Sequence, residues 1–307
     1  MKIKNTLLLF MTAMIWGFAF IAQRVGVESI GNYTFNAIRF ALGAVSLIPV
    51  ILFLEHRETN GEHRQKMKKT MKVSVLAGVV LFTASTLQLY GIAITQSAGK
   101  SGFITSLYMV LVPVIGILMK KKTNINTWLG VAFGIAGMFL LSISDDWKIG
   151  LGDVLLLIGA VFWALHIIVI DENSHDIYVL RFSSVQFAVV SILAGVFALI
   201  FEDVGMDAIR MSVIPILYTG ICSTAIAYTC QAIGQKNADP TYAAIILSTE
   251  SVFGAIGGVL FLNESMPLRG YLGCAMIFAG IIISQLKPAR LTKKSVSTKD
   301  IHANDYR

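Results

Sequence analysis

Residues 128–137 read WLGVAFGIAG, and residues 271–280 read YLGCAMIFAG. An aromatic residue begins each decapeptide, and the leucine, the first glycine and the closing Ala-Gly recur at an offset of 143 residues. A second pair, Trp16 and Trp163, recurs at 147 residues. Self-similarity at a long interval indicates a structure built from two copies of one unit. The sequence therefore predicts an internal repeat that covers most of the chain, with small insertions between its halves.

Both decapeptides lie in long apolar stretches. The chain has 307 residues, of which 55% are hydrophobic and 14% are charged, against roughly 25% charged residues in an ordinary soluble protein. A helix needs about 20 apolar residues to cross a bilayer core, whereas spanning strands would show alternating segments of about 10 residues. The sequence predicts an all-α integral membrane protein with ten transmembrane helices. The predicted spans are residues 5–23, 33–54, 72–92, 99–118, 126–143, 151–170, 181–201, 212–233, 240–262 and 269–286.

The number of spans in each repeat sets the topology. Short connections make successive spans alternate in direction, so a repeat of five spans enters the membrane from the opposite side the second time. Inverted repeats are typical of secondary transporters, in which two halves rock about a site near the bilayer midplane. We predict one five-helix repeat over residues 1–147 and a second, inverted one over residues 148–286. Residues 287–307 are polar without periodicity, which predicts a disordered cytoplasmic tail.

Basic residues gather on one side of the predicted membrane. With the N-terminus inside, 19 Lys and Arg residues fall on the cytoplasmic side and 5 on the outside, as the positive-inside rule requires. Both termini of this multi-pass protein are therefore predicted in the cytoplasm, and residues 5–23 are expected to be a retained helix rather than a cleaved signal peptide. The basic runs at 64–72, 120–122 and 287–294 adjoin spans, so we expect contacts with anionic lipid headgroups and not with nucleic acid.

Short motifs, taken in their order along the chain, resemble the EamA-type branch of the drug/metabolite transporter superfamily. They are Trp16-Gly17, echoed by Trp163-Ala164, then Arg39-Phe40, Ser97-Ala98-Gly99 at the start of the fourth span and Leu262-Asn263-Glu264 at the end of the ninth. The resemblance covers residues 5–286. It implies a ten-helix inverted-repeat transporter of a bacterial cytoplasmic membrane, of a family that commonly exports amino acids or other small metabolites.

One position departs from the family pattern. Ser251 follows Glu250 where many relatives have proline, whereas the first half keeps Pro113. Proline interrupts helices because it lacks an N–H group and its ring clashes with the preceding turn. We therefore expect the break in the ninth span to be softened.

Three Arg, Glu or His residues lie in predicted spans away from the span ends, where a charge costs roughly 2.5 to 3.5 kcal/mol. Arg39 either snorkels to the interface or ties helices together, or it binds a substrate carboxylate with its guanidinium fork. Glu250 lies near the midplane, and its approximate repeat mate is Val112. Its carboxyl group either pairs with a neighbouring helix in neutral form, or binds an amino-bearing substrate or a proton; it is the main functional candidate. His166 is either a packing residue or a proton carrier that lines the cavity.

Aromatic and amide residues complete the predicted site. Trp16 and Trp163 are expected near the midplane on opposing halves, where they shape a cavity. Tyr90 and Tyr228 lie toward opposite ends of their spans and are either gates or members of the aromatic belts at the membrane surfaces. Gln88, Tyr108 and Gln231 are weaker candidates, since intramembrane amides and hydroxyls often serve helix packing.

The sequence favours a transporter over the other classes of membrane protein. An enzyme needs a convergent set of reactive groups, and three separated ionisable residues do not form one. We expect no cofactor, no metal site and no nucleotide site. The prediction is a secondary transporter that moves a small organic metabolite by alternating access; the alternative is a channel or a non-transporting scaffold. Its expected partners are the substrate and the bilayer, with a proton or counter-substrate as the candidate driving partner, and it is expected to work as a monomer or homodimer.

Overall fold

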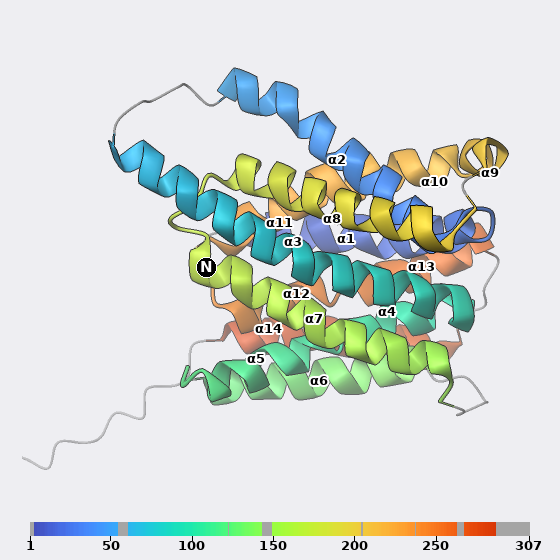
Figure 1. Cartoon of the computed structure of the whole chain (residues 1–307). Helices are drawn as coiled ribbons and strands as arrows, with labels where there is room; N and C mark the ends of the chain where they lie inside the picture. Colours follow the sequence, from blue (N-terminus) through green and yellow to red (C-terminus); the bar gives the residue numbers. More distant parts are fainter. Residues whose placement is uncertain are drawn as a thin grey trace, which may run out of the picture.

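The computed structural model describes residues 3–54, 61–121, 123–142, 149–203, 205–236, 238–262 and 267–286. All regular structure in these residues is helical. Eight helical segments are long and apolar enough to cross a membrane, and two shorter apolar helices, Ile125–Leu140 and Leu268–Ser284, complete the predicted set. The helices lie side by side along one common direction (Figure 1). The predicted all-α membrane fold is therefore confirmed.

The first half of the chain makes five crossings. They are α1 (Ile3–Val27), α2 (Asn32–Leu54), α3 (Gly61–Thr95), the pair α4 (Ala98–Ser106) and α5 (Tyr108–Leu118), and α6 (Ile125–Ser142). Helix α3 starts 11 residues before the predicted span at residue 72. The added turns are rich in Lys, Arg and Gln, which favour helix but are too polar to be found by a search for apolar residues.

The second half also makes five crossings. They are α7 (Leu151–Asn173), α8 (Val179–Phe201), a composite eighth crossing, the pair α12 (Pro240–Leu247) and α13 (Glu250–Leu262), and α14 (Leu268–Gln285). The eighth crossing consists of α10 (Val213–Leu217), the π-helix η1 (Tyr218–Tyr228) and α11 (Thr229–Gln235), and the short α9 (Met206–Met211) precedes it. Such π-helical segments are rare and are found mainly at functional sites.

The two repeated decapeptides lie against each other in the structure. Helix α6 packs on α14 (Figure 1). A Cβ atom added to Gly130 would lie 2.6 Å from the carbonyl oxygen of Gly280, and one added to Gly137 would lie 2.5 Å from that of Gly273. Because Gly130 and Gly137 are the repeat mates of Gly273 and Gly280, each contact is the image of the other. This reciprocity is what a two-fold relation between the repeats requires.

Polar contacts define the two ends of the bundle. At the end where α1 begins, Asn5 donates a hydrogen bond to the Lys236 carbonyl after α11 (2.7 Å). Lys121, after α5, pairs there with Asp171 of α7 (2.9 Å). We call this the basic end, and the other the opposite end. At the opposite end, Glu202 after α8 accepts hydrogen bonds from the backbone N–H of Thr34 (2.8 Å) and of the preceding residue, which caps the positive N-terminus of α2.

Some predictions fall outside the described residues. The boundary between the predicted repeats at 147/148, the predicted tail at 287–307, and Asn263-Glu264 of the family motif all lie there. Leu262, the first residue of that motif, ends α13.

Candidate functional site

Two interrupted helices meet at the centre of the bundle. The fourth crossing breaks between α4 and α5 at Leu107, and the ninth breaks between α12 and α13 at Ser248 and Thr249. The Ser106 hydroxyl lies 3.5 Å from the Ser248 carbonyl oxygen and 3.3 Å from Oε1 of Glu250. Interrupted helices in corresponding positions of two repeats mark the substrate site in many secondary transporters. The junction is therefore the first place to seek a site.

The ninth crossing is interrupted at Ser248 and Thr249, although Ser248 keeps helical backbone angles (φ −62°, ψ −14°). The expected softening of this break stays a prediction. The hydroxyl groups at the break bond back to the backbone: Ser248 to Ile245, Thr249 to Ile246, and Ser251 to Ser248. Such local bonds compete with the helical ladder and bend helices. Serine and threonine therefore interrupt this crossing without a proline.

A pocket lies beside the junction and joins both halves of the chain. It receives side chains from α1, α2, α3, α4, α5, α7, η1 and α13. The cavity measures about 20 Å³, and one water molecule needs about 10 to 15 Å³. This conformation is therefore closed around space for a water or two, and an organic ligand requires the helices to separate. The lining residues are Trp16, Phe20, Gln23, Arg39, Gln88, Thr105, Tyr108, Trp163, Ser223, Tyr228 and Glu250.

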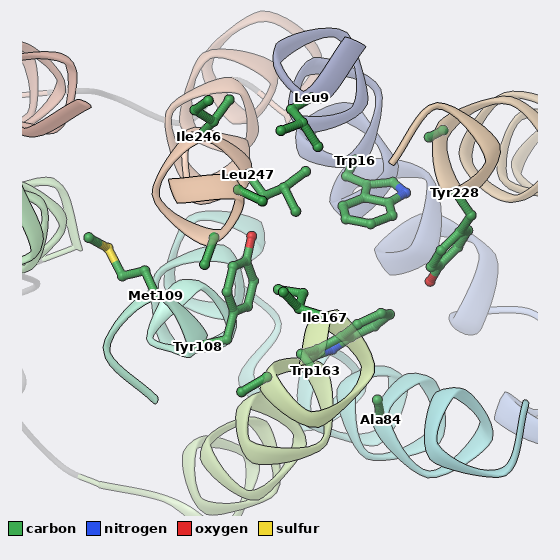
Figure 2. Packing of buried hydrophobic residues seen from close by; sticks show 14 of the residues in the cluster. Leu9, Trp16, Ala84, Tyr108, Met109, Trp163, Ile167, Tyr228, Ile246 and Leu247 are labelled. Carbon is green, nitrogen blue, oxygen red and sulfur yellow. The ribbon is translucent and has the colours of Figure 1, made fainter. Parts of the chain in front are cut away.

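Three aromatic rings form one wall of the pocket. Trp16 lies edge-on to Tyr228 at 4.8 Å between ring centroids, and Trp163 stacks on Tyr228 at 6.2 Å. Figure 2 shows the two tryptophans approaching the tyrosine from α1 and α7. The Trp16 indole N–H donates to the Ser223 carbonyl in η1 at 3.1 Å, which fixes its ring. The two tryptophans, which come from opposite halves of the chain, lie 6.1 Å apart between ring centroids.

Arg39 supplies a positive charge to the pocket. It is 2% exposed, its Nε atom donates to Asn36 Oδ1 at 2.9 Å, and its guanidinium carbon lies 4.5 Å from the Phe40 ring centroid. Among the described residues, no acidic side chain forms an ion pair with it. A buried charge is costly unless it is paired. The amide and the ring orient the guanidinium, and neither neutralises it.

Glu250 supplies a carboxyl group on the other side. It is 3% exposed, it begins α13, and a Cβ on Gly17 of α1 would lie 2.6 Å from its carbonyl oxygen. In the described part of the chain it has hydrogen bonding from Ser106 but no basic partner. Tyr228 lies within electrostatic reach of both Glu250 and Arg39.

The repeat mate of Glu250 differs from the one predicted. Tyr108 begins α5 as Glu250 begins α13, at an offset of 142 residues, so Tyr108 is the structural counterpart and Val112 is not. The Tyr108 hydroxyl lies within electrostatic reach of the Glu250 carboxyl group, and Figure 2 shows the ring crossing toward the end of α12 at Leu247. The two halves thus place a phenol and a carboxyl group at equivalent positions, side by side.

Gln88 also lies in the pocket, as predicted, with a partner that the sequence did not reveal. Its Nε2 atom donates to Gln23 Oε1 at 3.0 Å, which links α3 to α1. Gln23 was missed because it adjoins Arg24 near the end of its helix, where a polar residue is unremarkable. Phe20, Thr105 and Ser223 were missed because their types are common in spans.

The remaining predicted site residues are His166, Tyr228 and Tyr90. His166 is buried but does not line the pocket; it lies behind Tyr228, at 6.0 Å between ring centroids, and pairs with Gln186. Tyr228 lies in the central wall and not near a helix end, because i→i+5 bonding in η1 advances the chain less per residue than an α-helix does. Tyr90 lies apart from the pocket, against Tyr33 of α2 at 5.5 Å.

In the part of the chain that the structure describes, no three His, Cys, Asp or Glu side chains come together as a metal site. The pocket offers a ligand charged groups, amides, hydroxyls and aromatic rings.

The fold and the pocket define a polytopic membrane protein of two inverted repeats with interrupted helices around a central site, an architecture found in many membrane transporters. The EamA-like transporter family matches residues 4–143 and again residues 150–286. The chain belongs to this family, and it is a multi-pass membrane transporter.

Several relatives and one structure are similar to this chain. An "Uncharacterized transporter" of Archaeoglobus fulgidus is 28% identical over 90% of this chain and 84% of its own length. "Uncharacterized transporter YoaV" of Bacillus subtilis is 23% identical over 88% and 93%. "Uncharacterized inner membrane transporter YedA" of Escherichia coli K12 is 22% identical over 51% and 49%. A crystal structure with 17% identity covers 92% of this chain and 96% of its own, with a TM-score of 0.73; it supports the fold alone. These names indicate a transporter and not an enzyme.

Proposed function

We propose that this protein exports a small zwitterionic metabolite, an amino acid or a related compound, across the cytoplasmic membrane by alternating access. One observation carries the proposal. Arg39 from the first repeat and Glu250 from the second line the same aromatic pocket, and neither is neutralised by a described side chain. A ligand with a carboxylate and an ammonium group supplies both missing partners.

The pocket matches the parts of such a ligand. The guanidinium fork of Arg39 suits a carboxylate, which it can bind through two hydrogen bonds. Glu250 suits an ammonium group, and the faces of Trp16 and Tyr228 add attraction for a cation. Phe20 and Trp163 leave an apolar wall for the remainder of the molecule. Neutral sugars leave both charges unpaired and are expected to bind weakly.

Ion pairs at both ends support alternating access. At the opposite end, Lys100 of α4 pairs with Asp153 of α7 at 2.8 Å. At the basic end, Lys121 pairs with Asp171 at 2.9 Å and also with Glu172. Burial alone would lower the pKa of Lys121, but its hydrogen bonds to Glu172 and Asp171 hold that pKa above its ordinary value, so the lysine stays charged. Each of these ion pairs joins the two repeats, so the ion pairs at one end must break before that end can open.

The proposed moving units are the repeats at residues 1–147 and 148–286, with both termini in the cytoplasm at the basic end. Tyr228 blocks the path from the pocket to the basic end. Tyr90, which packs on Tyr33, blocks the path to the opposite end. A proton or a counter-substrate drives the cycle, and Glu250 is the group that binds it. Trp16 and Trp163 shape the cavity between the barriers.

The substrate class is tested by thermal unfolding of the detergent-purified protein with matched ligands. We expect phenylalanine to raise Tm more than phenethylamine, which lacks the carboxylate, or 3-phenylpropionate, which lacks the ammonium group. A ligand at 100 times its Kd stabilises a protein by about 2.7 kcal/mol. Choline-like cations, nucleosides and sugars complete the panel. Stabilisation by a sugar or nucleoside, with no response to any amino acid, would contradict the zwitterion proposal.

A further inference from the structure

Polar side chains are buried between α7, α8 and α11, outside the central pocket and behind Tyr228. His166 of α7 and Gln186 of α8 are both 0% exposed. Nε2 of the histidine lies 3.0 Å from Oε1 of the glutamine. The histidine ring stands perpendicular to Tyr228, with centroids 6.0 Å apart. The pair is therefore adjacent to the pocket wall, on its far side.

Several polar atoms in this region lack a hydrogen-bond partner among the described residues. They are Nδ1 of His166, Nε2 of Gln186, Oγ of Ser183 and both amide atoms of Gln231. Each of these side chains is fully buried. Nearly all buried polar side-chain atoms pair with protein or with ordered water. Water is the partner that such atoms take when no protein group reaches them.

The side chains with unpartnered atoms come from helices that pack together: α11 contacts both α7 and α8, and His166 of α7 contacts Gln186 of α8. Tyr228, Gln231 and Gln235 are three and four residues apart, so they share one face of the eighth crossing. Tyr228 packs on Trp163 of α7, and Gln235 donates to the Ile167 carbonyl of the same helix at 3.2 Å. Gln231 lies between these two contacts in the sequence, on the same helix face. Oε1 of Gln235, at the last residue of α11, also lacks a partner among the described groups.

We propose that His166, Gln186, Ser183, Gln231 and Gln235 bind a file of water molecules that forms the basic-end half of the transport path. Tyr228 separates this file from the central pocket. The inference rests on the proposed function for its role in transport, but the water file itself does not. When Tyr228 moves, the same side chains hydrogen-bond the polar groups of the cargo as it passes.

The packing of Tyr228 agrees with a closed barrier. Its ring contacts Trp16 at 4.8 Å and Phe187 at 5.6 Å, and it is 3% exposed. No backbone bond of η1 needs to break for this side chain to change rotamer. Ala232, the residue after Gln231, belongs instead to an apolar cluster with Ile170 and Phe182. Ala232 therefore offers a control position in apolar surroundings, next in the sequence to Gln231.

Cysteine accessibility tests the proposal in the full-length protein in membranes. In a background without Cys222, Cys230 and Cys274, Gln231→Cys and Ser183→Cys are treated with a cargo-sized, membrane-impermeant ammonium methanethiosulfonate. A thiol reacts as its thiolate, which apolar surroundings suppress, so we expect modification about tenfold faster than at Ala232→Cys. Labelling should come from the basic-end side of the membrane. Full labelling of each variant after denaturation checks that its thiol is intact.

The outcomes separate the water file from the transport proposal. Rates at both test positions equal to that of Ala232→Cys, or labelling from the opposite end alone, would overturn the file. Gln231→Leu, which keeps the size but removes the amide, is expected to slow amino-acid transport in proteoliposomes. If labelling is as expected but no amino acid is transported by the wild-type chain, the proposed substrate fails and the water file stands.

Discussion

Replacement of Glu250 with glutamine is expected to lower amino-acid transport about tenfold or more, because a hydrogen bond to a charged group contributes about 1.5 to 3 kcal/mol and about 1.4 kcal/mol corresponds to tenfold in affinity. The amide keeps the shape and can still accept from Ser106, so insertion and Tm should be preserved. Uptake of labelled phenylalanine into proteoliposomes measures the effect across a range of pH.

A matched control is available on the surface. Glu28 is an exposed glutamate between α1 and α2, and Glu28→Gln makes the same chemical change away from the pocket. It should transport as the wild-type chain does. Wild-type rates in Glu250→Gln at every pH tested would remove Glu250 from the mechanism and leave its pairing with Ser106 as a purely structural contact.

Replacement of Arg39 with glutamine is expected to abolish the preference for ligands that carry a carboxylate. Phenylalanine should lose about tenfold or more in affinity, on the same reckoning of one charged hydrogen bond, while phenethylamine should bind as before. Arg39→Lys keeps the charge but loses the planar fork and its stacking on Phe40. Its affinity for phenylalanine should therefore lie between those of the wild-type chain and Arg39→Gln. Ligand-dependent thermal shifts give both affinities.

The same experiment distinguishes a binding role for Arg39 from a structural one. An arginine that only ties helices together would lower Tm on substitution and leave the order of ligands unchanged. Lower Tm in Arg39→Gln, with phenylalanine still preferred over phenethylamine by the wild-type margin, would therefore assign the residue to packing through Asn36 and Phe40.

The repeat could be predicted from the sequence because its key contact uses the residues that repeat. Gly130 and Gly280 are close in space since only a residue without a side chain allows the helices to approach so closely. The same reasoning identified Trp16, Trp163, Arg39 and Glu250, because large aromatic or charged groups are rare within spans. All four line the central pocket.

The details of the pocket could not be predicted because ordinary residues create them. The break at Leu107 contains neither glycine nor proline, and the one at Ser248 depends on hydroxyl groups bonding to the backbone. The π-helical turn that brings Tyr228 to the centre has no apolar periodicity of its own. Consequently Tyr228 was expected near a helix end, and Tyr108 was not recognised as the counterpart of Glu250.

The central claim is that a binding site in this pocket is exposed alternately to the two sides of the membrane. Counterflow in proteoliposomes tests it most directly: vesicles loaded with unlabelled phenylalanine are diluted into a trace of labelled phenylalanine. A transporter that alternates exchanges the two, so labelled substrate should accumulate transiently above its outside concentration, and Glu250→Gln should suppress this accumulation. A channel equilibrates the label without an overshoot. The account would be contradicted if labelled phenylalanine entered at the same rate with and without internal phenylalanine. It would also be contradicted if no amino acid entered at all.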